Sequence, residues 1–227
     1  MNPLEEKYSD PRLLELTGFV EDYLRQKIKN GFQSKVHGFS HMLWVAEKAE
    51  ELVEKEGGTI EQQKLTYIAG LFHDIVRPKP LLMNANDEPP EVASAKIAVQ
   101  KLMELGYSQQ EINVVEQAIL GHSFGVELSG NRKDVALAAG LVAECLMAAD
   151  KIRQFLPSIA RERAIFIEES IENPSKEQVV DYWRRRIEKA EEFLDSPAGL
   201  RLLKHEPDLK KQFLLVKKYF REKILSS

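Results

Sequence analysis

Two segments of the chain place metal-binding side chains on otherwise apolar helical faces. In H-G-F-S-H-M-L-W-V-A, His41 shares a face with Val45 and Ala49, because residues four positions apart lie on one side of a helix. In L-T-Y-I-A-G-L-F-H-D-I, a stripe of apolar residues ends in the adjacent His73 and Asp74. An imidazole and a carboxylate are therefore delivered together to the protein interior.

An ionised aspartate costs several kcal/mol or more to bury unless a cation offsets its charge. A divalent metal ion supplies that charge. Histidine nitrogens with an aspartate oxygen suit Mn, Fe, Co, Ni or Zn, while Mg, which prefers a site richer in oxygen, stays as an alternative. A further acid, Asp150, ends the apolar run A-E-C-L-M-A-A-D. We expect one divalent metal ion, held by His41, His73, Asp74 and Asp150.

Helices must position these ligands, because apolar residues recur at helical spacing and no alternating strand pattern stands out. Ser40, Thr59 and Ser108 are expected to cap helices, and Ser196-Pro197 is expected to separate the last two helices. Helix 91–105 is expected to turn Met103 inward together with Ala95, Ala98 and Leu102. The expected helices cover about 11–29, 41–56, 59–74, 91–105, 109–122, 135–150, 158–171, 175–194 and 206–225.

Two segments lack a helical pattern. Residues 76–90 contain four prolines and form an irregular loop, since proline breaks helix interiors. The loop leaves directly from Asp74, so it is either a lid that selects substrate or a plain surface connection, with equal weight. Residues 125–131 are rich in turn-forming residues.

Composition excludes several classes of protein. The 227 residues, 43% of them hydrophobic, suffice for one helical domain. A net charge of −4 and a pI near 5.8 argue against a general nucleic-acid binder. A single cysteine, Cys145, excludes an internal disulfide. The acidic N-terminal residues do not resemble a signal peptide, and no apolar run approaches the length of a membrane span. A cytoplasmic protein is expected, and a homo-oligomer stays open.

Four motifs in order extend the pattern: H-x-x-x-H before V-A, L-F-H-D-I, I-L-G-H-S-F around His122, and E-x-x-x-x-x-D-K from Glu144 to Lys151. With them, the sequence resembles the HD-domain metal-dependent phosphohydrolases, closely over about residues 30–155. The resemblance implies an all-α fold in which residues 1–227 form a single HD-type helical bundle. Its metal-binding core would span about 30–155, with C-terminal helices from about 156 to 227 packed on it.

The resemblance also implies hydrolysis of a small phosphorylated metabolite, with a nucleotide favoured, by metal-activated water. Asp74 would hold or deprotonate that water. His122 matches a histidine near the reacting group, as a phosphate contact, a proton donor or a ligand of a second metal. Arg77 and Lys151 directly follow metal residues and would neutralise phosphate, with solvated surface charge as the alternative.

Two further residues have roles with open alternatives. His37 is expected either to face the substrate or support a metal ligand, or to be a plain loop histidine. Glu144 matches a family acid and would orient a ligand or a water molecule, with a simple salt bridge as the alternative. Family members that hold two metals need additional histidines before the final aspartate, whereas residues 86–95 here contain Glu88 and Glu91 but no histidine. One metal is therefore expected.

Two alternative functions are compatible with the same helical fold. One is a ligand-sensing or interaction domain whose metal is structural. A structural site is usually closed by four protein ligands away from mobile loops, which disfavours this reading. The other is an oxygenase of the same fold class, which would use two irons and more histidine ligands than this sequence offers.

Overall fold

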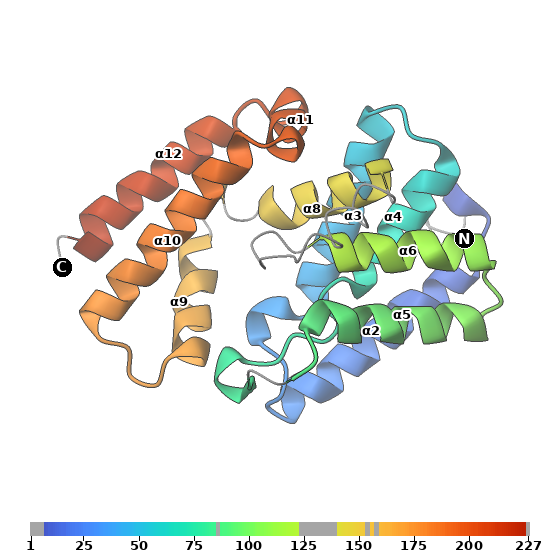
Figure 1. The fold of residues 1–227 in the computed structure, drawn as a ribbon, viewed down its shortest axis with the longest axis horizontal. Coiled ribbons are helices and arrows are strands. Elements are labelled where there is room, and N and C mark those ends of the chain that lie inside the picture. The colour runs from blue at the N-terminus through green and yellow to red at the C-terminus, as the bar shows by residue number, and fades with distance from the viewer. Residues whose placement is uncertain (1–6, 85–86, 123–139, 153–154, 157–158, 226–227) are drawn as a thin grey trace.

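The computed structural model describes residues 7–84, 87–122, 140–152, 155–156 and 159–225, and these residues contain helices and no strand (Figure 1). This confirms the all-α prediction. The α-helices are α2 (Arg12–Lys29), α3 (Phe39–Lys55), α4 (Ile60–Phe72), α5 (Pro90–Glu104), α6 (Gln109–Gly121), α8 (Gly140–Ile152), α9 (Ile159–Ser170), α10 (Lys176–Leu194), α11 (Pro197–His205) and α12 (Leu209–Tyr219). The single turns are η1 (Lys35–His37) and η2 (Pro80–Leu82), and π-helical turns η4 (Phe220–Leu225) continue α12.

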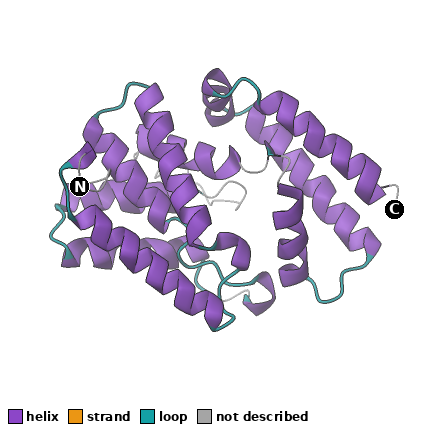
Figure 2. Ribbon diagram, turned by 180° about the vertical axis from the view of Figure 1, so that it is seen from behind, coloured by secondary structure: helices purple, strands orange, loops and turns teal. Residues whose placement is uncertain are grey.

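Helices α2 to α6 and α8 pack together, and we call them the N-terminal bundle. Helices α9, α10 and α12 stand beside this bundle (Figures 1 and 2). Helix α11 contacts both α8 and α3, while α9 contacts the turns η1 and η2. The helices that follow the N-terminal bundle therefore meet it at two places, one of them next to the segment that carries His37.

Helices α3 and α4 form the centre of the N-terminal bundle and approach closely at Gly70. A Cβ atom at this position would lie only 2.5 Å from the Cα of Ala46 on α3. Because real Cβ atoms do not approach backbone so closely, a side chain here would push the two helices apart. Gly70 thus permits the contact that brings His41 on α3 and His73 at the end of α4 together.

The predicted apolar stripes are buried on these helices, and two of the three predicted caps are present. Thr59 and Ser108 each accept a hydrogen bond from the backbone of the third helical residue, in complete capping boxes. The prediction that Ser40 caps a helix starting at His41 was wrong. Helix α3 begins at Phe39, with Gly38 at the cap position and no side-chain cap, so Ser40 lies within the first turn.

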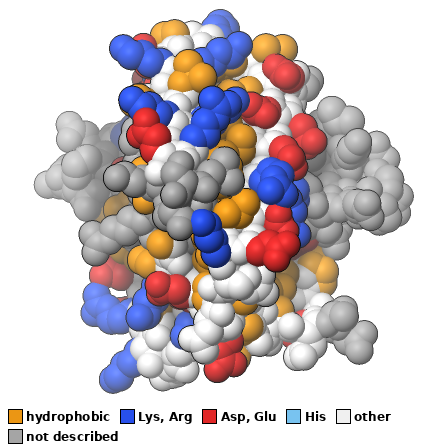
Figure 3. Space-filling view, turned by 90° about the vertical axis from the view of Figure 1, so that its left-hand side faces the viewer, with side chains coloured by type: hydrophobic (Ala, Val, Ile, Leu, Met, Phe, Trp, Pro, Cys, Tyr) orange, Lys and Arg blue, Asp and Glu red, His pale blue; other side chains and the backbone are white. Residues whose placement is uncertain are grey.

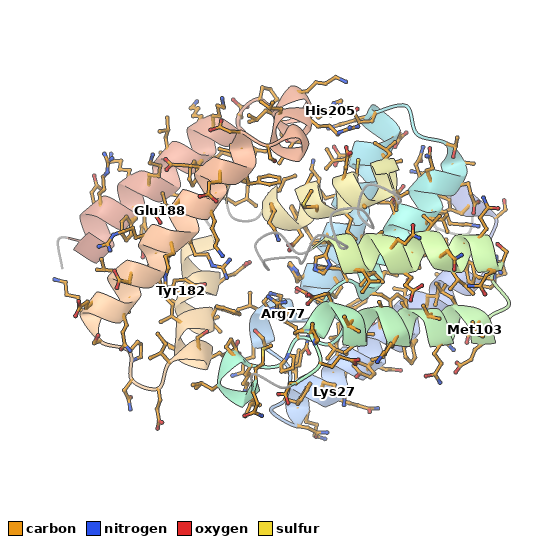
Figure 4. All side chains as sticks on the ribbon, in the orientation of Figure 1. Lys27, Arg77, Met103, Tyr182, Glu188 and His205 are labelled. Atoms are coloured by element: carbon orange, nitrogen blue, oxygen red, sulfur yellow. The ribbon has the colours of Figure 1, made fainter. Side chains whose placement is uncertain are left out.

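One other prediction was wrong and one helix was missed, although the predicted break at Ser196-Pro197 is present after α10 ends at Leu194. Met103 is 62% exposed on the outer side of α5 (Figure 4), because the buried stripe runs through Ala98 and Leu102 and Met103 lies off it. Ser196-Pro197 begins a helix that was not predicted, α11. Ser196 caps it by accepting from the Gly199 backbone N–H at 3.1 Å, and proline is tolerated in a first helical turn.

Charged residues of both signs, with hydrophobic side chains between them, lie on the face that α10 and α12 form (Figure 3). Lys217 of α12, for example, pairs with Glu191 of α10 at 2.5 Å. Such exposed pairs stabilise little. The packing of these helices depends more on apolar contacts such as Phe155 against Phe193 and Phe213, at ring-centroid distances of 6.0 and 5.2 Å.

The loop after Asp74 is largely irregular, as predicted, although Pro80–Leu82 form one 3-10 turn. Pro78 bridges back to Gln33, which ties the start of the loop to the segment before α3. The predicted turn at 125–131 and the start of the helix predicted from 135 lie outside the described residues. In the described part of the chain, the helices are too short or too polar to cross a membrane.

Candidate metal centre

Four helices and one turn bring their histidines and acids to one place inside the N-terminal bundle. His41 lies in the first turn of α3, and Asp150 lies in the last turn of α8. His73 and His122 are the residues that end α4 and α6, and Asp74 follows His73. His37 joins from η1, immediately before α3. The side chains are buried or nearly so.

The imidazoles form a row. Ring centroids lie 5.3 Å apart for His37 and His41, 5.2 Å for His41 and His73, and 5.0 Å for His73 and His122. The two carboxylates lie alongside this row. The structure therefore brings together all four predicted metal ligands, and it adds His37 and His122 to the same cluster.

The donor atoms form three overlapping groups, each with its atoms within 4.8 Å of one another. The groups are His41, His73 and Asp150; His37, His41 and Asp74; and His73, Asp74 and His122. In the first group, Nε2 of His41 and of His73 lie 3.7 and 3.8 Å from Oδ1 of Asp150. In the others, Nε2 of His37 and of His122 each lie 3.6 Å from an oxygen of Asp74. We refer to all six residues as the histidine–aspartate cluster.

These separations are too long for hydrogen bonds. They are a few tenths of an ångström longer than the roughly 3.0 to 3.4 Å between ligand atoms that bind one ion at about 2.1 Å, so a bound ion would draw the side chains slightly together. Nε2 of His73 and Oδ1 of Asp74 are buried, and no hydrogen-bond partner reaches either of them among the described residues. Buried acceptors that face one another repel unless a cation lies between them.

Backbone carbonyls set the orientation of two of the imidazoles. Nδ1 of His73 donates to the Gly70 carbonyl at 2.8 Å, and Nδ1 of His122 donates to the Ile119 carbonyl at 2.5 Å. With the proton of a neutral ring on Nδ1, each ring turns the lone pair of Nε2 toward the cluster. This is the tautomer that binds a metal, so the residues present fit a divalent transition metal.

Burial and neighbouring charges give the cluster the protonation states of metal ligands. Burial lowers the pKa of His41 well below its ordinary value, and it lowers the pKa of His73. Burial alone would raise the pKa of Asp74, but Arg77 foremost outweighs it and holds that pKa well below its ordinary value. Lys151 does the same for the pKa of Asp150. Neutral imidazoles thus face ionised carboxylates.

Arg77 and Lys151 both lie beside the cluster. Arg77 Nη1 is 3.5 Å from Asp74 Oδ1, and Lys151 Nζ is 2.5 Å from Asp150 Oδ2. Arg77 lies on the side of the N-terminal bundle that faces α9 (Figure 4). Asp74 raises the pKa of Arg77, and Glu91 adds to this effect from the first turn of α5, where it is buried. Each acid that enters the cluster therefore has a cationic neighbour.

The remaining candidates lie elsewhere. Glu144 pairs with Arg201 of α11 at 2.5 Å, the salt bridge that was the alternative to a role at the metal. Glu88 pairs with Lys96 on the surface. His205 lies outside the cluster and hydrogen-bonds to Glu56, the residue that ends α3 (Figure 4).

Gln33 is a buried residue of the site that the sequence did not indicate. Its side-chain amide donates to the carbonyls of His37 and Asp74, each at 3.1 Å, and accepts from the Arg77 backbone N–H at 2.8 Å. One side chain thus satisfies three backbone groups that would otherwise be buried without partners. No motif or spacing singles out a lone glutamine, so only the folded chain reveals this role.

The lowered histidine pKa values predict how the metal-free protein responds to acid. Below pH about 6.5 the unfolded chain takes up protons on His41 and His73 while the folded protein does not, so stability falls as the pH falls. The free energy of unfolding should drop by up to about 1.4 kcal/mol per pH unit for each histidine. Asp74 and Asp150 act in the same direction, but only below about pH 4. Urea unfolding of chelator-treated protein between pH 7.0 and 5.0 measures the slope.

His73→Gln should reduce this slope, because it removes one of the two histidines whose pKa burial lowers. A free energy of unfolding that stays constant or rises from pH 7.0 to 5.0 would contradict the assigned burial of neutral imidazoles.

Comparison with protein families matches residues 38–153 to the HD domain. The matched segment is about half of the chain and contains His41, His73, Asp74 and Asp150. A curated but uncharacterized protein of Clostridium beijerinckii (strain ATCC 51743 / NCIMB 8052) is 31% identical over 86 residues, which are 38% of this chain and 52% of that protein. The chain thus spans about half the length of this relative. No solved structure matches the chain significantly.

Proposed function

The chain belongs to the HD domain family, and from this membership and its histidine–aspartate cluster we propose that it is a metal-dependent phosphohydrolase. The observation that carries the proposal is a set of buried acceptor atoms, facing one another without hydrogen bonds, beside two cationic side chains. The acceptors suit a metal ion and the cations suit a phosphate. A small phosphorylated metabolite, with a nucleotide favoured, is the proposed substrate.

The proposed metal ligands are His41, His73, Asp74 and Asp150, with one ion per chain. A bound divalent ion supplies Lewis acidity and lowers the pKa of a water molecule attached to it. More acceptors converge here than the four that close a structural site, because His37 and His122 face the same cluster. This surplus supports a catalytic site over a structural one.

Each side chain of the site has a separate role in the proposed hydrolysis. Asp74 orients the attacking water and accepts its proton, since Asp74 is held ionised by Arg77. The water oxygen bonds to phosphorus as the bond to the leaving oxygen breaks. The proton that Asp74 accepts passes to Nε2 of His122, which lies 3.6 Å from Asp74, and from there to the leaving oxygen. Arg77 and Lys151 offset the negative charge that the phosphate carries.

The test combines metal content with a substrate screen. The purified protein is measured by elemental analysis, stripped, and reloaded singly with Mn, Fe, Co, Ni, Zn or Mg. Each form is then offered phosphomonoesters, nucleotides and cyclic or linear phosphodiesters. We expect release of phosphate, or cleavage of a phosphodiester, by at least one reloaded form and none by the stripped protein. Stoichiometric metal without turnover of any phosphate ester would favour the ligand-sensing alternative.

A further inference from the structure

Helix α9, which follows the segment matched to the HD domain, reaches the metal centre through Glu169. The Glu169 carboxylate contacts the turn before α3 with both oxygens. Its Oε1 accepts from the Lys35 backbone N–H at 3.0 Å, and its Oε2 accepts from the Ser34 hydroxyl at 2.5 Å. Ser34 is fully buried. The carboxylate is thus fixed at two points across 134 and 135 positions of sequence.

The Ser34 hydroxyl links this carboxylate to His37. Its oxygen lies 3.2 Å from Nδ1 of the His37 ring. Because carboxylate oxygens accept and the hydroxyl has one proton, the Ser34 proton points to Glu169. The Ser34 oxygen is left to accept from Nδ1–H. This direction places the proton of a neutral His37 ring on Nδ1 and leaves the lone pair on Nε2.

The lone pair then faces the cluster. Nε2 of His37 lies 3.6 Å from Oδ2 of Asp74, so two acceptor atoms oppose each other. A cation, or a water molecule that donates to both, stabilises that arrangement. The rings of His73 and His122 obtain the same tautomer from backbone carbonyls, whereas His37 obtains it from the Ser34 hydroxyl, whose proton Glu169 of α9 accepts. Phe166, one turn earlier on α9, also contacts the His37 ring edge-on at 5.8 Å.

We infer that Glu169 is a positioning residue of the metal centre: through Ser34 it holds His37 with its proton on Nδ1 and offers Nε2 to the metal site. The inference rests on the metal site of the proposed function but not on the reaction. Without the carboxylate, the Ser34 hydroxyl can turn and donate to Nδ1. The ring proton then moves to Nε2, where it points at Asp74 and opposes a metal ion.

Nitrogen NMR of histidine reads this tautomer directly. Metal-free protein labelled with ¹⁵N-histidine is recorded in long-range ¹H–¹⁵N spectra, and the His37 signals are assigned by their loss in His37→Gln. In the wild-type protein we expect a protonated Nδ1 and an unprotonated Nε2. In Glu169→Gln the amide can donate to Ser34, so the His37 signals should shift toward the Nε2–H form. Ser34→Ala removes the oxygen that accepts the Nδ1 proton, so it should also shift the His37 signals toward the Nε2–H form.

Zinc affinity, measured by competition with a chromogenic chelator, gives a second readout. We expect it to fall about 10- to 100-fold in Glu169→Gln and Ser34→Ala, as is typical when a hydrogen-bond partner of a metal-site residue is lost. The matched control is Glu168→Gln, which removes an exposed carboxylate from the neighbouring position of α9 and should change neither tautomer nor affinity.

Two results would overturn the inference. A protonated Nε2 on His37 in the wild-type protein refutes it, whether or not the variants fold. Unchanged tautomer and zinc affinity in Glu169→Gln refute it as well. Failure of the proposed function would look different, because a protein that turns over no phosphate ester can still show the Nδ1–H tautomer and its loss in the variants.

Discussion

Asp74→Ala should remove most of the bound metal and abolish hydrolysis, the largest effect expected of any single substitution. Asp74 and His73 deliver two ligands from one helix end, and the Asp74 oxygens lie within 3.8 Å of the Nε2 atoms of His37, His73 and His122. Its loss therefore removes the charge around which the site is arranged. Elemental analysis after gel filtration and turnover of the best phosphate ester measure the two effects.

Stability must be separated from chemistry in this experiment. Asp74 is also the main ion-pair partner of Arg77, and loss of one member of a buried pair destabilises proteins by about 3 to 5 kcal/mol. Asp74→Asn keeps the volume of the side chain and removes only the charge, so it should lose metal and activity with a smaller loss of folded protein. Circular dichroism verifies folding of both variants.

His205, which lies outside the histidine–aspartate cluster, provides the control. His205→Ala should alter neither metal content nor rate, because its partner Glu56 keeps ion pairs with Arg201 and Lys204 at 2.9 and 3.1 Å. Full metal occupancy in a folded Asp74→Ala protein would refute the ligand assignment.

His122→Ala should lower kcat by roughly 10²- to 10⁴-fold, the range typical of a lost acid–base group, while metal content stays near one ion per chain. The physical reason is position. The Nε2 of His122 lies 3.6 Å from Oδ1 of Asp74 at one end of the row of rings, and His122 is not a member of the group formed by His41, His73 and Asp150. Steady-state kinetics and elemental analysis of the same preparation test this prediction.

A second-metal ligand would behave differently. Metal content would then be near two ions per wild-type chain and fall to one in His122→Ala, and excess metal would partly restore the rate. We expect one ion because residues 86–95 supply no histidine and Glu88 pairs with Lys96 on the surface. Glu91 does turn inward, but its charge acts on Arg77. A measured ratio of two that drops to one would make His122 a ligand.

The sequence by itself determined the helical fold and the family of the metal site. Capping boxes at Thr59 and Ser108 and the apolar stripes on α3 and α4 depend on residues within a few positions of one another, so spacing predicts them. The histidines and aspartates that converge in the structure were recognisable because they end apolar stripes, where an unpaired polar group is costly.

Prediction from neighbouring residues failed where one sequence pattern is compatible with two local structures. Ser196-Pro197 matches a helix break and a helix start equally well, and its outcome as the start of α11 depends on packing of that helix against α8 and α3. Likewise Met103 is apolar and was predicted to belong to the buried stripe of α5, but its side chain stays exposed.

Only the tertiary structure decided which polar residues support the site. Gln33 bonds to the Asp74 carbonyl across 41 positions, and Glu169 bonds to Ser34 across 135. A hydrogen bond requires two groups within about 3 Å in space, and nothing in the order of residues along the chain specifies such a pair. The packing of the helices brings these partners together, so their roles at the metal centre appear only in the folded protein.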